Sequence, residues 1–142
     1  MTKYRHGMSN DRFLEMVAQP GHKFPAGIGE YDDDRDWAGP ANDPKLAAMI
    51  PDEIMGVSIK QAAYRHDYDY AAGGNWFTRL IDDRTFRRGC ARIVDIYYRS
   101  KRMTKAEYRL ARKFCWTYYL AVRLGGRKSY NYHKKSEAGD DS

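Results

Sequence analysis

The chain has 142 residues, a formal net charge of +6 and a sequence pI near 9.3. This charge favours anionic partners, such as nucleic acid or phospholipid headgroups, or simply keeps the protein soluble. Hydrophobic residues make up 42% and aromatic residues 14% of the chain, which excludes a disordered protein. The two cysteines, Cys90 and Cys115, exclude a fold stapled by disulfides and are expected to be buried free thiols.

We expect one helical domain over residues 1–128 and a flexible polar tail over residues 129–142. The N-terminus has no apolar run typical of a signal peptide, and no stretch is long and apolar enough to span a membrane. We therefore expect a cytoplasmic protein, unless something else releases it.

The first predicted element is a short helix over residues 10–18, with Phe13, Leu14 and Val17 on one side and Pro20-Gly21 after its end. Residues 22–51 show little periodicity, and long irregular segments of this kind are usually functional or disordered. Four acidic residues in this region match the spacing of a calcium-binding loop: Asp32, Asp34, Asp36 and Asp43. A tryptophan stands where such a loop needs glycine, so a solvated acidic loop is the favoured interpretation.

The next helix is predicted over residues 59–72. Ser58 and Gln61 form a capping-box pattern at its start, and Gly73-Gly74 are suited to a left-handed cap at its end. The positions that should face the core are, in order, Ile59, Ala62, Ala63, His66 and Tyr70. Asp67 lies one residue round, at the edge of this face.

A following helix is predicted from about residue 77 to residue 98, with Phe86, Cys90, Ile93 and Tyr97 on its inward stripe. Extended one turn back, this stripe meets Asp82 and Asp83, of which Asp83 is the better inward candidate. A third long helix should begin with the capping box of Thr104 and Glu107 and end at Gly125-Gly126. The expected fold is mainly α: an antiparallel pair of helices that carries a His-Asp site, a third long helix and an irregular N-terminal loop region.

The polar residues on the facing sides of these two helices predict general-base catalysis by a histidine. A partly buried histidine is the natural general base near neutral pH. Asp83, presented by the neighbouring helix, could fix the tautomer of His66, and Tyr70 could donate its hydroxyl to the same carboxylate. Asp67 would then be available for a hard cation, which prefers oxygen ligands.

Residues 61–70, Gln-Ala-Ala-Tyr-Arg-His-Asp-Tyr-Asp-Tyr, resemble the catalytic helix of phospholipase A2, whose pattern is Cys-Cys-x-x-His-Asp-x-Cys-Tyr. The family cysteines are replaced by Ala62, Ala63 and Asp69, as in disulfide-free relatives from viruses, phages and bacteria. Residues 83–86, Asp-Arg-Thr-Phe, are similar to the Asp-x-x-Phe of the family's second helix. The resemblance covers residues 37–98. Within this range it includes the segment 50–58, just before the first of the two helices.

The resemblance implies a role for each matching residue. His66 would activate water, Asp83 would orient His66, Tyr70 would hydrogen-bond to Asp83, and Asp67 would ligate Ca²⁺. The other calcium ligands would be backbone carbonyls of an upstream loop, here residues 37–42, and the candidates are Trp37, Gly39 and Ala41. This loop departs from the Tyr-Gly-x-x-Gly-x-Gly-Gly pattern of the secreted enzymes. The implied activity is calcium-dependent hydrolysis of the sn-2 ester of phospholipids, by a cytoplasmic protein or a virion component.

Two alternatives stay open. The helices could keep this fold without catalysis, with His66 and Tyr70 as hydrogen-bonded core residues. The chain could also be a non-catalytic basic binding protein, a virion component or an inhibitor, that contacts nucleic acid or another protein. The basic residues that would serve this role, or docking to anionic lipid, are Arg79, Arg84, Arg87, Arg88, Arg92, Arg99, Lys101, Arg102, Lys105, Arg109, Arg112, Lys113, Arg123, Arg127 and Lys128. His6, His22 and His133 show no metal-site spacing, so we expect lone surface histidines.

Overall fold

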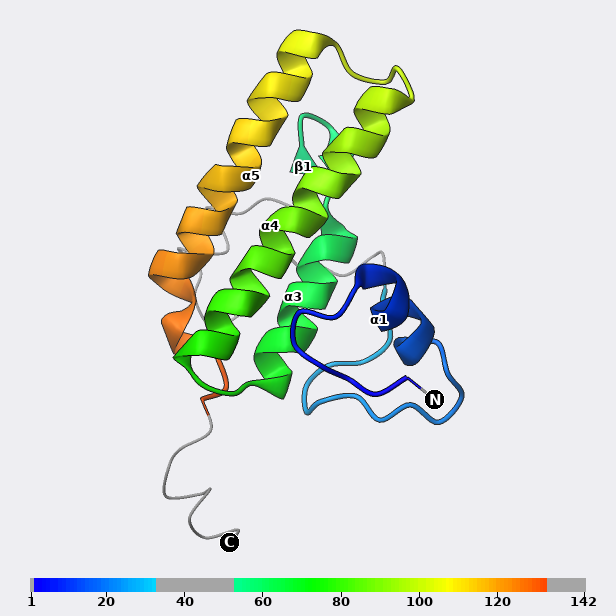
Figure 1. The fold of residues 1–142 in the computed structure, drawn as a ribbon, viewed down its shortest axis with the longest axis vertical. Helices are drawn as coiled ribbons and strands as arrows, with labels where there is room; N and C mark the ends of the chain where they lie inside the picture. The colour runs from blue at the N-terminus through cyan, green and yellow to red at the C-terminus, as the bar shows by residue number, and fades with distance from the viewer. Residues whose placement is uncertain (1, 33–52, 133–142) are drawn as a thin grey trace, which may run out of the picture.

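The computed structural model describes residues 2–32 and 53–132, and these parts form a mainly α fold (Figure 1). The elements in chain order are α1 (Asn10–Val17), β1 (Glu53–Ile54), β2 (Val57–Ser58), α3 (Lys60–Ala72), α4 (Trp76–Arg99), α5 (Lys105–Gly125) and the 3-10 turn η1 (Gly126–Lys128). In Figure 1, α3 and α4 lie side by side and run in opposite directions, while α5 packs along α4. The mainly α prediction is confirmed, and the helices lie close to the expected ranges.

A small hairpin precedes α3, and the sequence analysis did not predict it. The strands β1 and β2 are antiparallel, with Glu53 opposite Ser58. The turn residues Met55 and Gly56 have φ angles of 52° and 80°, as a tight two-residue hairpin turn requires. Because Ser58 is paired in β2, the predicted capping box of Ser58 and Gln61 is wrong, and α3 begins without a side-chain cap.

The helix α3 is buried on more sides than the single predicted stripe. Tyr64 and Tyr68 contact the ring of Phe13 from α1, with centroid distances of 6.2 and 5.0 Å. Ala62 faces α4 at Gly89, where an added Cβ would lie 3.3 Å from the Ala62 Cβ. Small residues therefore let α3 and α4 approach closely, and this closeness brings polar groups of the two helices into contact.

The segment after α5 folds back onto the end of α3. Tyr130 is buried and its ring meets Tyr70 edge to face at 4.8 Å. The backbone N–H of Gly74 donates to the Asn131 carbonyl at 3.0 Å, and Asn131 N–H donates to the Tyr70 carbonyl at 3.2 Å. The expected tail boundary at residue 129 is therefore too early, because residues 129–132 pack against the helices; residues 133–142 lie outside the described residues.

Gly73, which ends α3, has a φ of 70°, and a Cβ at this position would collide with the Asn131 backbone. We expect Gly73→Ala to lower the free energy of unfolding by about 3 kcal/mol, from backbone strain and the loss of this contact. The matched control is Gly21→Ala, where φ is 77° and a Cβ would meet nothing within 4 Å; it should lose about 1 kcal/mol. Urea unfolding of both variants measures the difference, and equal losses would show that the packed C-terminal segment contributes nothing.

Candidate functional site

The start of α4 is fixed by a capping box. The Asn75 side chain accepts hydrogen bonds from the backbone N–H groups of Phe77 and Thr78, at 2.9 and 3.0 Å, while Thr78 Oγ1 accepts from Asn75 N–H at 2.8 Å. The Asn-x-x-Thr spacing could have indicated this cap. With the short Gly73–Gly74 link before it, this cap sets the rotation of α4 and so the side on which Asp83 lies.

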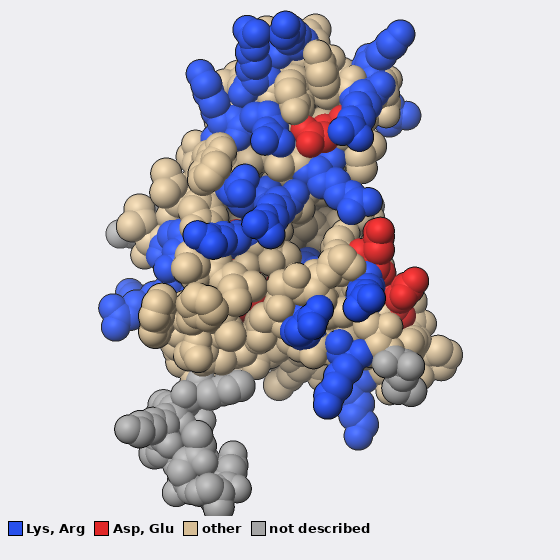
Figure 2. All heavy atoms as spheres, in the orientation of Figure 1, with Lys and Arg blue, Asp and Glu red and all other residues tan. Residues whose placement is uncertain are grey.

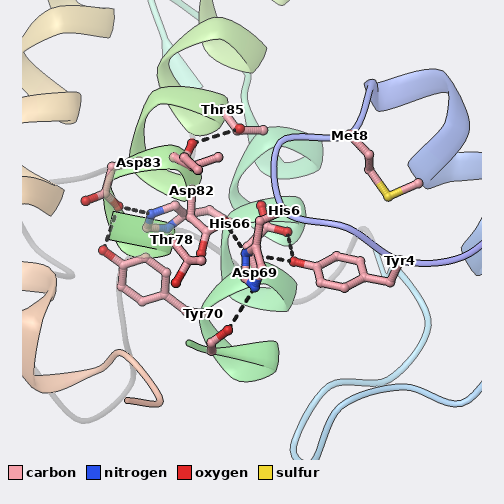
Figure 3. A network of polar contacts seen from close by, with 12 residues as sticks. Tyr4, His6, Met8, His66, Asp69, Tyr70, Thr78, Asp82, Asp83 and Thr85 are labelled. Carbon is pink, nitrogen blue, oxygen red and sulfur yellow. Dashed lines mark hydrogen bonds and ion pairs between the residues drawn. The ribbon is translucent and has the colours of Figure 1, made fainter. Parts of the chain in front are cut away.

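His66 of α3 and Asp83 of α4 point toward each other (Figure 3). The His66 Nε2 atom lies 2.8 Å from Asp83 Oδ1, and the Tyr70 hydroxyl donates to the same oxygen at 2.6 Å. A carboxylate only accepts, so Nε2 must carry a proton and Nδ1 is left with the lone pair of the neutral imidazole. The contacts that the sequence analysis expects among these three residues are thus present, and their catalytic roles remain predictions.

The second oxygen of Asp83 is held by arginines. Arg123 of α5 donates to Oδ2 at 2.8 Å, and Arg79 Nε lies 3.8 Å from this oxygen. Arg79 also donates to the Tyr70 hydroxyl at 3.4 Å and to the Val122 carbonyl at 3.4 Å. The expectation that Arg79 belongs to the basic surface is wrong, because its side chain is buried. A buried carboxylate needs such partners to offset its lost hydration.

The protonation equilibria of the pair shift in opposite directions. Burial by itself lowers the pKa of His66, but the hydrogen bond and charge of Asp83 outweigh it and raise this pKa above its ordinary value. Burial would raise the pKa of Asp83, but the hydrogen bonds from His66, Tyr70 and Arg123 hold it below its ordinary value. Burial and Asp83 also raise the pKa of Tyr70, so its hydroxyl stays protonated. The site therefore stabilises a proton on His66 beside an ionised Asp83.

Asp67 follows His66 on α3 and is partly exposed. Its negative charge helps to raise the pKa of His66, which places the two groups close together. The other calcium ligands expected from the resemblance, Trp37, Gly39 and Ala41, lie outside the described residues, as do three of the four acidic residues of the expected loop. Of the implied calcium site, the structure thus describes Asp67 alone.

A second polar cluster lies next to the His66–Asp83 pair, and it involves residues that the sequence does not indicate as a site. His6 Nδ1 lies 2.6 Å from Asp82 Oδ1, and the Tyr4 hydroxyl donates to Asp69 Oδ1 at 2.5 Å. Arg65 contacts the same Asp69 carboxylate at 3.2 Å. Asp82 and Asp69 are fully buried, so the preference for Asp83 alone as the inward residue was incomplete.

Two histidines were assigned wrongly. His6 is only partly exposed and hydrogen-bonds to Asp82 and to the Gly73 carbonyl. His22 Nε2 lies 2.9 Å from the Tyr68 hydroxyl. Both contacts join residues far apart in the chain, so spacing could not predict them, and the expectation of lone surface histidines is wrong for these two. His133 lies outside the described residues.

Basic side chains cover much of one face of the molecule (Figure 2). A hollow between α4 and α5 is lined by Arg87, Arg88, Ala91, Arg92, Asp95, Ile96, Arg99 and Arg112. Arg87 stacks over the Trp116 ring at 4.2 Å, while Arg112 pairs with Asp95 at 3.3 Å. No helix among the described residues is long and apolar enough to cross a membrane.

Comparison with protein-family models, with curated proteins and with solved structures finds no match to this chain. The geometry around His66 and the residue pattern of α3 and α4 are therefore the basis for a functional proposal.

The raised pKa of His66 can be measured without any substrate. In NMR titrations of the metal-free protein with chelator present, we expect the His66 imidazole to titrate above the ordinary value of about 6.5. Asp83→Asn should lower this pKa, because burial then acts without the carboxylate that opposes it most strongly. The proton on His66 contributes stability that is complete below the unfolded-state pKa and is lost as the pH rises through the folded-state pKa. A wild-type value below 6.5 would contradict the description of the pair.

Arg123 should stabilise the fold through the ionised form of Asp83. We expect Arg123→Gln to lower the free energy of unfolding at pH 7 by about 2 kcal/mol, because Asp83 Oδ2 loses its closest donor. Since the pKa of Asp83 is lowered in the folded state, this contribution is present above the ordinary aspartate pKa and is lost as the pH falls through the folded-state value. The exposed Arg127 provides the matched control: Arg127→Gln should change stability by less than about 0.5 kcal/mol. Denaturant unfolding at several pH values tests both, and a loss at pH 7 that persists unchanged in acid would contradict the assignment.

Proposed function

We propose that this protein is a calcium-dependent hydrolase similar to phospholipase A2, which cleaves the sn-2 ester of phospholipids with a water molecule activated by His66. One observation carries this proposal: Asp83 Oδ1 receives both His66 Nε2–H and the Tyr70 hydroxyl. This arrangement leaves the lone pair on His66 Nδ1, the atom that a general base needs. The motif resemblance over residues 61–70 and 83–86 supports the same function independently of these distances.

In the proposed reaction, a water molecule hydrogen-bonds to His66 Nδ1 and gives up a proton to this atom as its oxygen attacks the ester carbonyl. The ionised Asp83 stabilises the imidazolium that forms, and Tyr70 and Arg123 keep Asp83 ionised and in place. When the carbon–oxygen bond to the glycerol breaks, the proton on Nδ1 passes to the leaving alkoxide. The products are a fatty acid and a lysophospholipid, and His66 returns to its neutral form.

The described residues fit a hard cation at one position. Asp67 is a partly exposed carboxylate beside His66, which is the ligand type that calcium prefers. The carbonyl ligands proposed to complete the site are those of Trp37, Gly39 and Ala41. When bound, calcium supplies a Lewis acid that polarises the ester carbonyl.

The proposed partner is a phospholipid surface, contacted peripherally. Three apolar side chains on α5 are exposed: Trp116, Leu120 and Leu124, at 51%, 55% and 86%. Exposed tryptophan and leucine among basic residues are typical of a helix that lies at a lipid interface. Each Lys or Arg near an anionic surface adds about 1 kcal/mol of attraction. Such a protein would act in the cytoplasm or as a virion component.

The arginine-lined hollow between α4 and α5 favours a second candidate, a non-catalytic basic protein (a virion component or an inhibitor) that binds nucleic acid or another protein. In that case the pair of His66 and Asp83 would only hold the helices together. Binding would weaken steeply with salt, and it would be reduced by Arg88→Gln and Arg92→Gln but not by changes at His66.

The decisive experiment is hydrolysis of mixed anionic phospholipid vesicles, with calcium or with chelator. Wild-type protein should release sn-2 fatty acid only with calcium, and His66→Gln should reduce the rate by about 100-fold or more, because the general base is removed. His22→Gln is the matched control, since this histidine is partly buried and is also hydrogen-bonded, but to Tyr68. Circular dichroism must show that all three proteins are folded.

Each outcome decides between the candidates. Calcium-dependent release that is lost in His66→Gln and kept in His22→Gln supports the hydrolase. If the folded wild type releases no fatty acid, or if both histidine variants are as active as wild type, the hydrolase is rejected for these lipids. Salt-sensitive binding of nucleic acid by this inactive protein would then favour the second candidate.

A further inference from the structure

A cluster next to the His66–Asp83 pair takes no part in the proposed reaction. His6, from the segment before α1, lies beside Asp82 of α4, and the Tyr4 hydroxyl connects it to Asp69 of α3 (Figure 3). One ligand atom from each of His6, Asp69 and Asp82 lies within 4.8 Å of the other two. We propose that these three residues bind a divalent transition-metal ion, with Zn²⁺ as the best match. This site is separate from the calcium site around Asp67 and does not depend on lipid hydrolysis.

The hydrogen bonds of His6 indicate that a cation belongs at its Nδ1 atom. Nε2 must donate to the Gly73 carbonyl, 2.8 Å away, because a carbonyl only accepts. Nδ1 then faces Asp82 Oδ1 at 2.6 Å, and two acceptors this close repel unless a proton lies between them. A metal ion can replace this proton once the two atoms move to the separation of about 3.4 Å that neighbouring ligands have in a tetrahedral site. A histidine whose far N–H donates to a backbone carbonyl is the usual arrangement of a metal-bound imidazole. In the metal-free protein a proton takes this position, and the proposed metal ion replaces it.

Asp82 supplies an independent observation. Its side chain is 0% exposed, and its Oδ2 atom has no hydrogen-bond partner within the part of the chain that the structure describes. The Tyr130 hydroxyl lies near this carboxylate and shares a hydrogen bond of 2.7 Å with Thr78 Oγ1, in which either oxygen can be the donor. A buried carboxylate oxygen without a donor loses its hydration and gains nothing in return. A metal ion bound by Asp82 would use this acceptor.

The ligand types select the class of metal. One imidazole nitrogen and two carboxylate oxygens are typical ligands of Zn²⁺, at about 2.0–2.2 Å in a tetrahedral site. Calcium prefers six to eight oxygens and gains little from imidazole. Arg65 lies 3.2 Å from Asp69 and offsets part of the negative charge of this carboxylate. The cluster therefore has less negative charge than a site for a hard cation requires. The Tyr4 hydroxyl, 3.3 Å from His6 Nδ1, lies where a fourth oxygen or a bound water belongs.

The position of the cluster gives the metal a structural effect. Its ligands come from the N-terminal segment, from α3 and from α4, which also carry His66 and Asp83. The His6 side chain is 18% exposed, so an ion has access from solvent. A metal bound here would fasten the N-terminal segment to both helices, and it would stabilise the folded state in proportion to the logarithm of its concentration above Kd.

The proposal is tested by calorimetric titration of chelator-treated protein with ZnCl₂ at pH 7.5. Absorbance with CoCl₂ serves as a second readout, because the visible bands of cobalt report tetrahedral coordination. We expect one metal ion per chain in the wild type. His6→Gln and Asp82→Asn should each weaken zinc binding about 100-fold or more and abolish the cobalt bands. His22→Gln and His66→Gln are the matched controls and should leave the zinc affinity unchanged.

Failure of this proposal can be distinguished from failure of the proposed hydrolase, because the experiment measures zinc binding and cobalt absorbance and not lipid hydrolysis. Circular dichroism of the metal-free variants establishes that they fold, and Asp82→Asn, which keeps the side-chain volume, is the variant least expected to disturb packing. Zinc binding of equal strength in wild type and both cluster variants would overturn the proposal, as would the absence of zinc binding by folded wild-type protein. Loss of binding in His22→Gln alone would place the metal elsewhere and overturn it as well.

Discussion

The buried carboxylate of Asp83 is the point at which the three long helices meet. Its two oxygens receive His66 from α3 and Arg123 from α5, while Asp83 itself belongs to α4. A buried carboxylate is strongly destabilised as an anion unless positive charges and hydrogen-bond donors compensate it. Both α3 and α5 supply such groups to Asp83, so both must be in place before Asp83 can be buried and ionised. The hydrogen bonds that define the candidate site thus also hold the helices in their packed arrangement.

The adjacent residues Asp82 and Asp83 connect this site to the N-terminal segment. Successive positions on a helix differ by about 100° in direction, so one carboxylate faces His66 and the other faces His6. Both are fully buried. Any movement of the first turns of α4 must disturb both networks together. The N-terminal segment is therefore coupled to the geometry of His66, although no hydrogen bond joins the described residues of this segment to the imidazole.

The spacing of apolar and polar residues along the sequence is sufficient to predict the helices and the contacts among His66, Tyr70 and Asp83. Helical periodicity by itself determines which side chains lie on the face of a helix that packs against its neighbour. The capping box at Thr104 and Glu107 is confirmed for the same reason, since it depends on neighbouring residues. The hairpin over residues 53–58 was missed, and a serine that it holds was read as a helix cap. The cluster of His6 with Asp82 was also missed, because these residues are 76 positions apart and only the tertiary fold brings them together.

The arginines of this chain fall into two groups, one that pairs with buried carboxylates and one that lies at the surface. Arg65, Arg79 and Arg123 turn inward and neutralise buried carboxylates, whereas those lining the hollow between α4 and α5 remain beside solvent. A net charge of +6 is therefore not evidence for a single anionic partner. The stronger indication of function is the difference between the two nitrogens of the buried His66 imidazole. A purely structural histidine gains most when both nitrogens are satisfied, and no hydrogen bond to Nδ1 is present among the described residues, whereas Nε2 is firmly held. That asymmetry is what a general base requires. The fold maintains it through Asp83 and the side chains that hold this carboxylate, which are Tyr70, Arg79 and Arg123.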